Sequence, residues 1–335
     1  MIVLRVPSRE CNMRVSDWGV RRCIQDIFLQ TAVRSSVVFV GTGLHTGQAV
    51  RVTVQPASAD YGIWFRRTDV NGVDPLVPAR WNRVTNTELN TRVTNHDGIS
   101  VSTVEHIMAA FAGCGLHNAL VEIDGPEVPL LDGSSAPFVA GILSCGLESL
   151  DAPVSAIRVL RPVKVTHGDA AAALMPSDDL RIEFEIDFAD AVIGRQEKSL
   201  NMANGAFVYE LCNSRTFCRK ADIDEMRARG LILGGSVTSA VVVDGDNVVT
   251  PGGMRHADEP VRHKMLDAFG DLALAGAPIL GRYVGRRAGH ATTNQLLRRL
   301  FADPEAFEIV ECDSRTAGRL PGAGLVREDA LGIAA

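Results

Sequence analysis

The segment Val261-Arg-His-Lys-Met-Leu-Asp-Ala-Phe-Gly-Asp-Leu272 combines the apolar spacing of an amphipathic helix with an unusual polar flank. The residues that form its single apolar stripe are Val261, Met265, Ala268, Phe269 and Leu272. At roughly 100° per residue, another arc of about 100° gathers four polar side chains. These are His263, Lys264, Asp267 and Asp271. The segment therefore predicts a packed helix with a histidine, an ammonium and two carboxylates on one flank.

Two interpretations of this polar flank are open at this point. It can be a solvated helix face with an ion pair between residues four apart, which most helices carry. It can also be half of a metal site, because His263 and Asp267 project in the same direction one turn apart. In that case both can reach one ion at roughly 2.0 to 2.2 Å, and a third ligand must come from elsewhere.

Composition and charge limit the class of protein. The 335 residues are 46% hydrophobic and 22% charged, as in ordinary globular proteins, and suffice for two domains. A net charge of −6 argues against a nucleic-acid binder. The cysteines occur without a C-x-x-C pair or a secretory signal, which indicates reduced thiols, and no apolar run has the length of a membrane span. We expect a cytoplasmic protein that binds no nucleic acid and makes no stable membrane insertion.

The order of elements predicts an α+β fold, because each half of the chain has strands and about two helices without strict alternation. The predicted strands are 35–41, 49–55, 119–123, 157–165, 180–188, 241–249 and 281–284. The predicted helices are 102–111, 139–143, 203–212, 221–229, 259–275 and 293–301. The best boundary between domains lies around 150–154, and we find no residue-level repeat.

His106 is the best candidate for the third ligand, since it lies off the apolar stripe of its helix near the N-terminal end. The neighbouring Glu105 could act as base for a metal-bound water. Alternatively, Ser102-x-x-Glu105 matches a capping box that closes the helix start. His290 follows a glycine in a predicted strand-to-helix turn. Such a turn either presents a functional side chain or is an ordinary helix-cap turn with an incidental histidine.

Several segments, in the same order along the chain, resemble the motifs of one enzyme family. They are Thr-Gly-Leu-His-Thr-Gly (42–47), Ser-Thr-Val-Glu-His (102–106), Asp-Gly-Ser-Ser-Ala-Pro-Phe (132–138), Ser-Arg-Thr-Phe (214–217), Gly-Leu-Ile-Leu-Gly-Gly-Ser (230–236), the segment 261–271 and Ala-Gly-His-Ala-Thr-Thr-Asn (288–294). The chain resembles the UDP-3-O-acyl-N-acetylglucosamine deacetylases, the zinc amidases of lipid A synthesis, from about Gln30 to at least Asn294.

The resemblance implies a zinc site made by His106, His263 and Asp267, with one Zn²⁺ per chain. Fe²⁺ is the alternative, because two histidines and a carboxylate suit either metal. Three protein ligands leave a fourth position for water, as in catalytic rather than structural zinc sites. Zinc lowers the pKa of such a water toward about 7.

The same resemblance implies the catalytic roles of four further residues. Glu105 accepts the proton of the attacking water, and the Thr216 hydroxyl helps to hold the tetrahedral oxyanion. His290 is protonated, and either stabilises that charge or donates a proton to the leaving amine. Asp271 keeps His290 cationic and oriented.

The resemblance also implies the substrate contacts. Lys264 faces the sugar nucleotide, where a diphosphate needs a cation, and Phe188 resembles an aromatic contact near the nucleotide. The segment 217–236 resembles an insert that forms an apolar passage for the acyl chain, although an ordinary helix and strand would show the same pattern. The residues assigned to that passage are Phe217, Ile223 and Ile232.

The implied fold has two similar α+β domains, each a small sheet with two helices, and the active site lies in the cleft between them. Domain I (30–153) supplies Glu105 and His106, and domain II (154–320) supplies the remaining site residues and the acyl-passage insert. Residues 1–29 are an N-terminal extension and 321–335 a C-terminal tail, both without an assigned role.

The implied reaction hydrolyses the 2-acetamido group of UDP-3-O-[(3R)-3-hydroxyacyl]-N-acetylglucosamine to a free amine and acetate, the committed step of lipid A biosynthesis. We expect a cytoplasmic monomer in a Gram-negative bacterium. Two rivals are a silent sugar-nucleotide binder and a metal-free hydrolase that uses Cys114 or Cys218.

Overall fold

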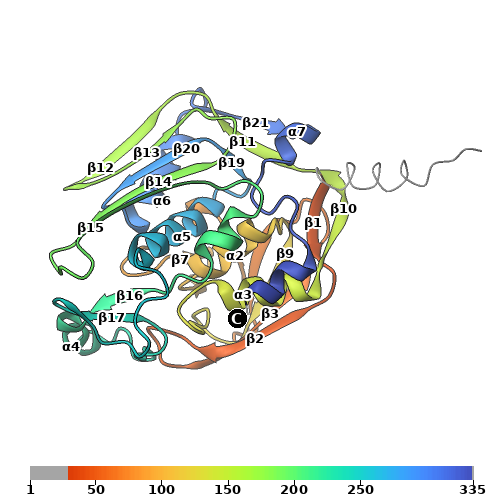
Figure 1. Ribbon diagram of the computed structural model, residues 1–335. Coiled ribbons are helices and arrows are strands. Elements are labelled where there is room, and N and C mark those ends of the chain that lie inside the picture. Colours follow the sequence, from red (N-terminus) through yellow and green to blue (C-terminus); the bar gives the residue numbers. More distant parts are fainter. Residues whose placement is uncertain (1–28, 334–335) are drawn as a thin grey trace, which may run out of the picture.

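The computed structural model describes residues 29–333 as an α+β protein, as the sequence predicts. Most of the predicted extension 1–29 and the last two residues of the predicted tail lie outside the described residues. Two five-stranded sheets form the outer layers, and the main helices lie between them (Figure 1). Within the described residues, no helix has the length and apolar character needed to cross a membrane.

The first sheet, sheet I, has the strand order β2-β3-β9-β4-β5. Its strands are β2 (Val37–Thr42), β3 (Ala49–Pro56), β4 (Ile63–Arg67), β5 (Leu76–Pro78) and β9 (Ala119–Ile123). Neighbouring strands are antiparallel except for β4 and β9, which are parallel. Alternate residues of β3 are buried, so one face of the sheet packs on the core. That face is covered by helices α2 (Glu105–Cys114) and α3 (Ala136–Cys145).

The second sheet, sheet II, repeats this topology with the order β12-β13-β20-β14-β15. Its strands are β12 (Val163–His167), β13 (Ala170–Met175), β14 (Arg181–Asp187), β15 (Arg195–Asn201) and β20 (Arg282–Arg286). Again only the pair β14–β20 is parallel. Helix α5 (Glu259–Ala273) precedes its last strand and α6 (His290–Phe301) follows it, as α2 and α3 do around β9. The chain therefore repeats a fold without repeating its residues.

Each sheet has an insert at the same point of the topology, between its fourth strand and the first of the two helices that cover it, which is α2 for sheet I and α5 for sheet II. The insert of sheet I comprises η1 (Trp81–Arg83), β6 (Val84–Asn86), β7 (Arg92–Thr94) and β8 (Ser100–Val101). The insert of sheet II comprises η2 (Phe207–Leu211), β16 (Phe217–Arg219), α4 (Lys220–Ala228), β17 (Val241–Asp244) and β18 (Asn247–Val248). Both inserts therefore precede a helix that contributes to the candidate site.

Smaller elements lie outside the two five-stranded sheets. Strand β1 (Leu29–Val33) pairs with β10 (Leu147–Pro153), and β11 (Ser155–Val159) lies between β19 (Ile279–Leu280) and β21 (Phe307–Glu311). The chain then forms α7 (Ser314–Ala317) and η3 (Arg327–Gly332). The predicted domain boundary falls between β10 and β11, and the domain limits remain a prediction.

Helices α2 and α5 pack together at very short distance in the middle of the molecule (Figure 1). A Cβ atom on Gly270 would lie 2.0 Å from the backbone oxygen of Glu105, so only glycine permits this approach. Almost all of α2 is buried, including Glu105 and His106. The close packing brings the start of α2 against the polar flank of α5.

Several predicted element limits are wrong, and the cause is local in each case. The predicted strand 157–165 is two strands, because Pro162 has no N–H for a continuous ladder. The predicted strand 241–249 is a hairpin that turns at Gly245, where φ is +60°. The predicted helix 203–212 contains only the five-residue η2, and α6 begins at His290 rather than near Thr292.

Candidate metal centre

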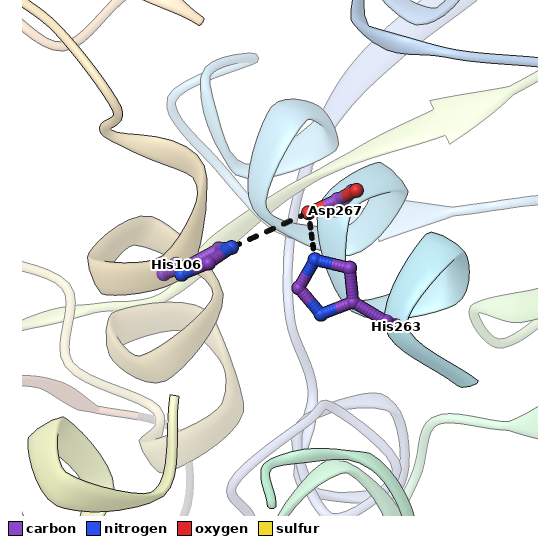
Figure 2. Close-up of side chains that lie close together, drawn as sticks. All are labelled: His106, His263 and Asp267. Atoms are coloured by element: carbon purple, nitrogen blue, oxygen red, sulfur yellow. Dashed lines mark ion pairs between the residues drawn. The ribbon is translucent and has the colours of Figure 1, made fainter. Parts of the chain in front are cut away.

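Helices α2 and α5 bring His106, His263 and Asp267 together, and all three side chains are buried (Figure 2). Nε2 of His263 lies 3.3 Å from Oδ1 of Asp267, and Nε2 of His106 lies 3.6 Å from the same oxygen. One ligand atom from each residue lies within 4.8 Å of the others. The i,i+4 spacing on α5 supplies two of the three groups, and α2 supplies the third.

The backbone fixes which nitrogen of His263 is available. Nδ1 of His263 lies 3.0 Å from the carbonyl oxygen of Ser214, which can only accept a hydrogen bond. Nδ1 therefore carries the proton, and Nε2 points its lone pair toward Asp267 (Figure 2). Burial lowers the pKa of His263 to about 4, so the ring is neutral at physiological pH.

The charge of Asp267 suits a metal ligand. Burial alone would raise its pKa, but the adjacent His263 and the Lys264 ammonium outweigh burial and hold that pKa well below its usual value. Oδ1 of Asp267 is buried, and among the described residues no hydrogen-bond donor reaches it. An orphaned carboxylate oxygen between two imidazole nitrogens fits a divalent metal ion, which would satisfy all three groups at once.

Glu105 lies next to His106 at the start of α2, but it does not form the capping box that its sequence suggested. The α2 start has no side-chain cap, and the Ser102 hydroxyl instead accepts a hydrogen bond from Arg92. Oε2 of Glu105 accepts the backbone N–H of Thr91 at 2.9 Å. Burial raises the pKa of Glu105, against the lowering effect of His290 and His106. A carboxylate with such a raised pKa is suited to accept a proton near neutral pH.

Asp271 and His290 form a buried pair beside Glu105. Nδ1 of His290 lies 2.8 Å from Oδ2 of Asp271, while Oδ1 accepts the hydroxyl of Thr91 at 2.6 Å. Burial opposes the charge on His290, but the Asp271 carboxylate prevails and raises the pKa of His290 to about 9. His290 is therefore a cation at neutral pH, with Nδ1 engaged by Asp271.

Lys264 lies on the same flank of α5, but its ammonium is already paired. Nζ donates to Oδ2 of Asp267 at 2.7 Å, so this cation holds the second oxygen of the candidate ligand. Burial would lower the pKa of Lys264, and the Asp267 carboxylate raises it instead. The ammonium has further N–H donors, which could still meet a substrate anion.

Thr216 lies in a short segment, 214–217, in which Ser214 and Phe217 both contact His263. The carbonyl of Ser214 holds the His263 ring, and the ring of Phe217 stands edge-on to it with 6.4 Å between centroids. The backbone N–H of Thr216 donates to Gly133 at 2.8 Å. The Phe188 ring packs edge-on against Phe217 at 5.4 Å. An aromatic pair from β16 and the end of β14 thus adjoins the triad.

The two isoleucines assigned to the acyl passage lie farther along the insert of sheet II. Ile223 is half-buried on α4. Ile232 has φ +49°, an uncommon conformation for a β-branched residue, and its N–H approaches Nδ1 of His45 at 3.4 Å. The segment around Ile232 therefore packs against the glycine-rich turn 42–47 of sheet I.

Sequence reasoning missed three contributors to the site. Thr91 binds both Glu105 and Asp271, but it lies in a polar segment without a distinctive motif. Gly270 has a detectable signal, because a glycine inside a helical pattern marks a close approach of backbones. His45 is buried with an Nε2 that no hydrogen-bond partner among residues 29–333 reaches, and burial lowers its pKa.

Comparison with known proteins covers most of the chain. Residues 30–302 match the family model described as UDP-3-O-acyl N-acetylglycosamine deacetylase. A UDP-3-O-acyl-N-acetylglucosamine deacetylase of Phenylobacterium zucineum is 46% identical over 280 residues, which cover 84% of this chain and 96% of that protein. Proteins of that same name from Shewanella oneidensis and from Shewanella sp. strain ANA-3 are 41% identical, over 88% and 89% of this chain and 98% and 99% of their own. The matched residues include both five-stranded sheets and every residue of the candidate site.

Proposed function

The chain belongs to the UDP-3-O-acyl N-acetylglycosamine deacetylase family, and we propose that it acts through a Zn²⁺ ion held by His106, His263 and Asp267. It is a hydrolase of an amide bond in lipid A biosynthesis, as the resemblance of its motifs predicted. The substrate is UDP-3-O-[(3R)-3-hydroxyacyl]-N-acetylglucosamine, whose 2-acetamido group becomes a free amine and acetate.

The observation that supports this metal centre best is the orphaned Oδ1 of Asp267 beside the Nε2 atoms of two buried histidines. When bound, Zn²⁺ supplies a Lewis acid that polarises an amide carbonyl and makes water acidic enough to yield hydroxide near neutral pH. Fe²⁺ suits the same ligands and is the alternative metal. Lys264 fixes the second oxygen of Asp267 and so limits how that carboxylate can rotate.

Glu105 is the general base of the proposed reaction. Its raised pKa and its place beside His106 suit a carboxylate that takes a proton from the water attacking the acetamido carbonyl. The N–H of Thr91 holds only one carboxylate oxygen, Oε2. The other oxygen is available for the proton.

His290 is the proposed general acid. Its Nδ1 is held by Asp271, so the proton on Nε2 is the one that passes to the leaving amine. The same cation stabilises negative charge on the carbonyl oxygen before the C–N bond breaks, and the Thr216 hydroxyl donates to that oxygen. Water loses one proton to Glu105 as its oxygen bonds to the carbonyl carbon, and His290 gives one proton to the nitrogen as the C–N bond breaks. The products are an amine and acetic acid, which ionises to acetate.

Substrate binding uses the surfaces around this centre. The Lys264 ammonium, which has donors beyond the one to Asp267, meets the nucleotide diphosphate, and Phe188 contacts the nucleotide side. The acyl chain lies along the insert of sheet II, against Phe217, Ile223 and Ile232. The protein acts as a monomer in the cytoplasm of a Gram-negative bacterium.

The rival cysteine mechanism has little physical support. Burial and the neighbouring Cys212 hold the pKa of Cys114 well above its usual value, and burial also raises the pKa of Cys218. Thiols of this kind are poor nucleophiles, because the thiolate is the reactive form. Full activity after alkylation of accessible thiols would agree with the amidase mechanism.

The proposed function is tested by the products of the purified protein. With UDP-3-O-(3-hydroxyacyl)-N-acetylglucosamine, we expect equal amounts of free amine and acetate. UDP-N-acetylglucosamine, which has no acyl chain, is the matched control and should react far more slowly. A protein that binds the acylated substrate in calorimetry yet releases no amine would instead be a silent binder.

A further inference from the structure

A cavity of about 240 Å³ lies beside sheet I, between the C-terminal parts of α2 and α5, and no residue of the metal triad lines it. Its walls come from the C-terminal parts of α2 and α5, from residues next to strands β4 and β5 of sheet I, and from residues 276–279 at the start of β19. No residue of the proposed catalytic machinery lines it. Since α2 and α5 also hold the triad, the cavity lies along the same two helices as the candidate active site.

Arg80 places a cation in this cavity without a partner of opposite charge among the described residues. Its guanidinium packs directly on Gly276, where an added Cβ would lie 1.4 Å from a guanidinium nitrogen. Gly62 lies on another side, with its corresponding position 3.2 Å from Arg80. Burial is the single cause that lowers the pKa of Arg80, with no carboxylate opposing it. A partly buried, unpaired guanidinium is costly, so its presence points to an anionic ligand.

His117 adds a neutral donor to the same cavity. The backbone N–H of Thr31 donates to Nδ1 of His117 at 3.2 Å, so Nδ1 has no proton and Nε2 carries it. Burial lowers the pKa of His117 to about 4, which keeps the ring neutral. The nearby Asn118 amide is already satisfied by Gly62 and Gln30. Among the described residues, the side-chain donors that remain for a ligand are therefore those of Arg80 and His117 and the hydroxyl of Ser155.

The rest of the wall is largely apolar and comes from both helices. Its large side chains include Met108, Phe111, Phe269 and Leu272. The acidic Asp60 is solvent-exposed at the edge, where the Gln30 side chain donates to it at 2.7 Å. A ligand that matches this lining has one anionic group and a compact apolar body.

We propose that this cavity is a second binding site, separate from the deacetylase centre, for a small amphipathic carboxylate. The carboxylate accepts the paired N–H donors of Arg80, and the apolar body lies between α2 and α5. Arginine suits this role because its planar fork binds both oxygens of a carboxylate.

Decanoate is the probe, with 1-decanol as its neutral counterpart, in calorimetric titrations of the full-length protein. We expect saturable binding of one decanoate at this site and at least tenfold weaker binding of decanol. Arg80→Gln should weaken decanoate binding at least tenfold. The matched control is Arg83→Gln, because Arg83 pairs with His96 outside the cavity and its loss should leave binding unchanged.

A cavity-filling variant keeps the test independent of the folding of Arg80→Gln. Ala273 lines the cavity from α5, and Ala273→Leu should also weaken decanoate binding at least tenfold. Circular dichroism and basal deacetylation report whether each variant is folded. Absence of saturable binding by the full-length protein, or equal binding by Arg80→Gln and wild type, would overturn the proposal. If decanoate binds in the proposed acyl passage instead, Arg80→Gln and wild type should bind it equally.

Discussion

Oδ2 of Asp271 lies 2.8 Å from Nδ1 of His290, and this buried contact keeps His290 a cation at neutral pH. Burial alone would make His290 a neutral ring. The adjacent carboxylate reverses that effect and raises the pKa of His290 to about 9. Thr91 occupies the other oxygen of Asp271, so the carboxylate is held from both sides.

Activity should fall on the alkaline side as His290 loses its proton. Because the pKa of His290 is about 9, kcat/KM should decline above roughly that pH. In His290→Ala this limb should disappear, along with most of the activity. The measurement is the pH–rate profile of both proteins, and an unaltered bell shape in the variant would exclude His290 as the acid.

Asp271→Asn should move the same limb to lower pH. The neutral amide keeps the side-chain shape but removes the negative charge that raises the pKa of His290, while burial continues to lower it. We expect a shift of about one pH unit or more. A limb that stays at its wild-type position would mean that another group sets it.

The same pair should make folding stability depend on pH. The pKa of His290 is raised from 6.5 to about 9 on folding, so its contribution is complete below about 6.5 and is lost as pH rises through 9. The free energy of unfolding of the metal-free protein should therefore decrease over that window, and decrease less in Asp271→Asn. Equal pH dependence in both proteins would contradict this origin.

Glu105→Gln should lose on the order of 10² or more in kcat while keeping its metal. Glutamine is close to glutamate in shape and can still accept the Thr91 N–H, but it cannot take a proton. Steady-state kinetics and metal analysis give the two readouts. Glu122→Gln is the control, since Glu122 pairs with Arg66 on sheet I. A fully active Glu105→Gln would remove the base from the mechanism.

His263→Ala should lose the metal itself. The substitution removes one of three ligands and leaves the buried Asp267 carboxylate without that imidazole. Metal content after dialysis should fall well below one ion per chain. His167→Ala on the exposed end of β12 is the matched control and should keep its metal. A fully loaded His263→Ala protein would disprove the ligand assignment.

Thr91→Val tests a residue that has no motif to identify it. Valine has nearly the same shape but cannot donate to Oδ1 of Asp271, which then remains buried with one fewer donor. We expect a loss of about 1.5–3 kcal/mol in stability and a lower kcat with metal retained. Denaturant unfolding and kinetics measure these effects, and an unchanged protein would show that this hydrogen bond is dispensable.

The sequence predicted the local parts of the site better than its long-range contacts. The polar flank of α5 follows from helical geometry. That Glu105 and His106 both lie in the site follows from their being adjacent in the sequence. The capping box at Ser102 was a wrong interpretation, because both of its side chains bind residues of the sheet I insert instead. Spacing along a helix cannot show that competition.

The repeated topology could not be predicted from the sequence, because the two halves share no residue-level repeat. Both sheets have one parallel pair among antiparallel strands, and each has an insert before the first of its two covering helices. Burial requires only an apolar pattern, so different residues satisfy the same arrangement. Thr91 meets Asp271 across 180 positions of sequence, a contact that depends on how the insert of sheet I packs against α5.

The most direct test of the metal mechanism is amine release from the acylated UDP-sugar before chelation, after chelation and after one equivalent of Zn²⁺ is restored. We predict that activity disappears with the metal and returns with zinc, and that His263→Ala does not recover under the same conditions. Full activity in protein shown by metal analysis to be free of metal would contradict the account.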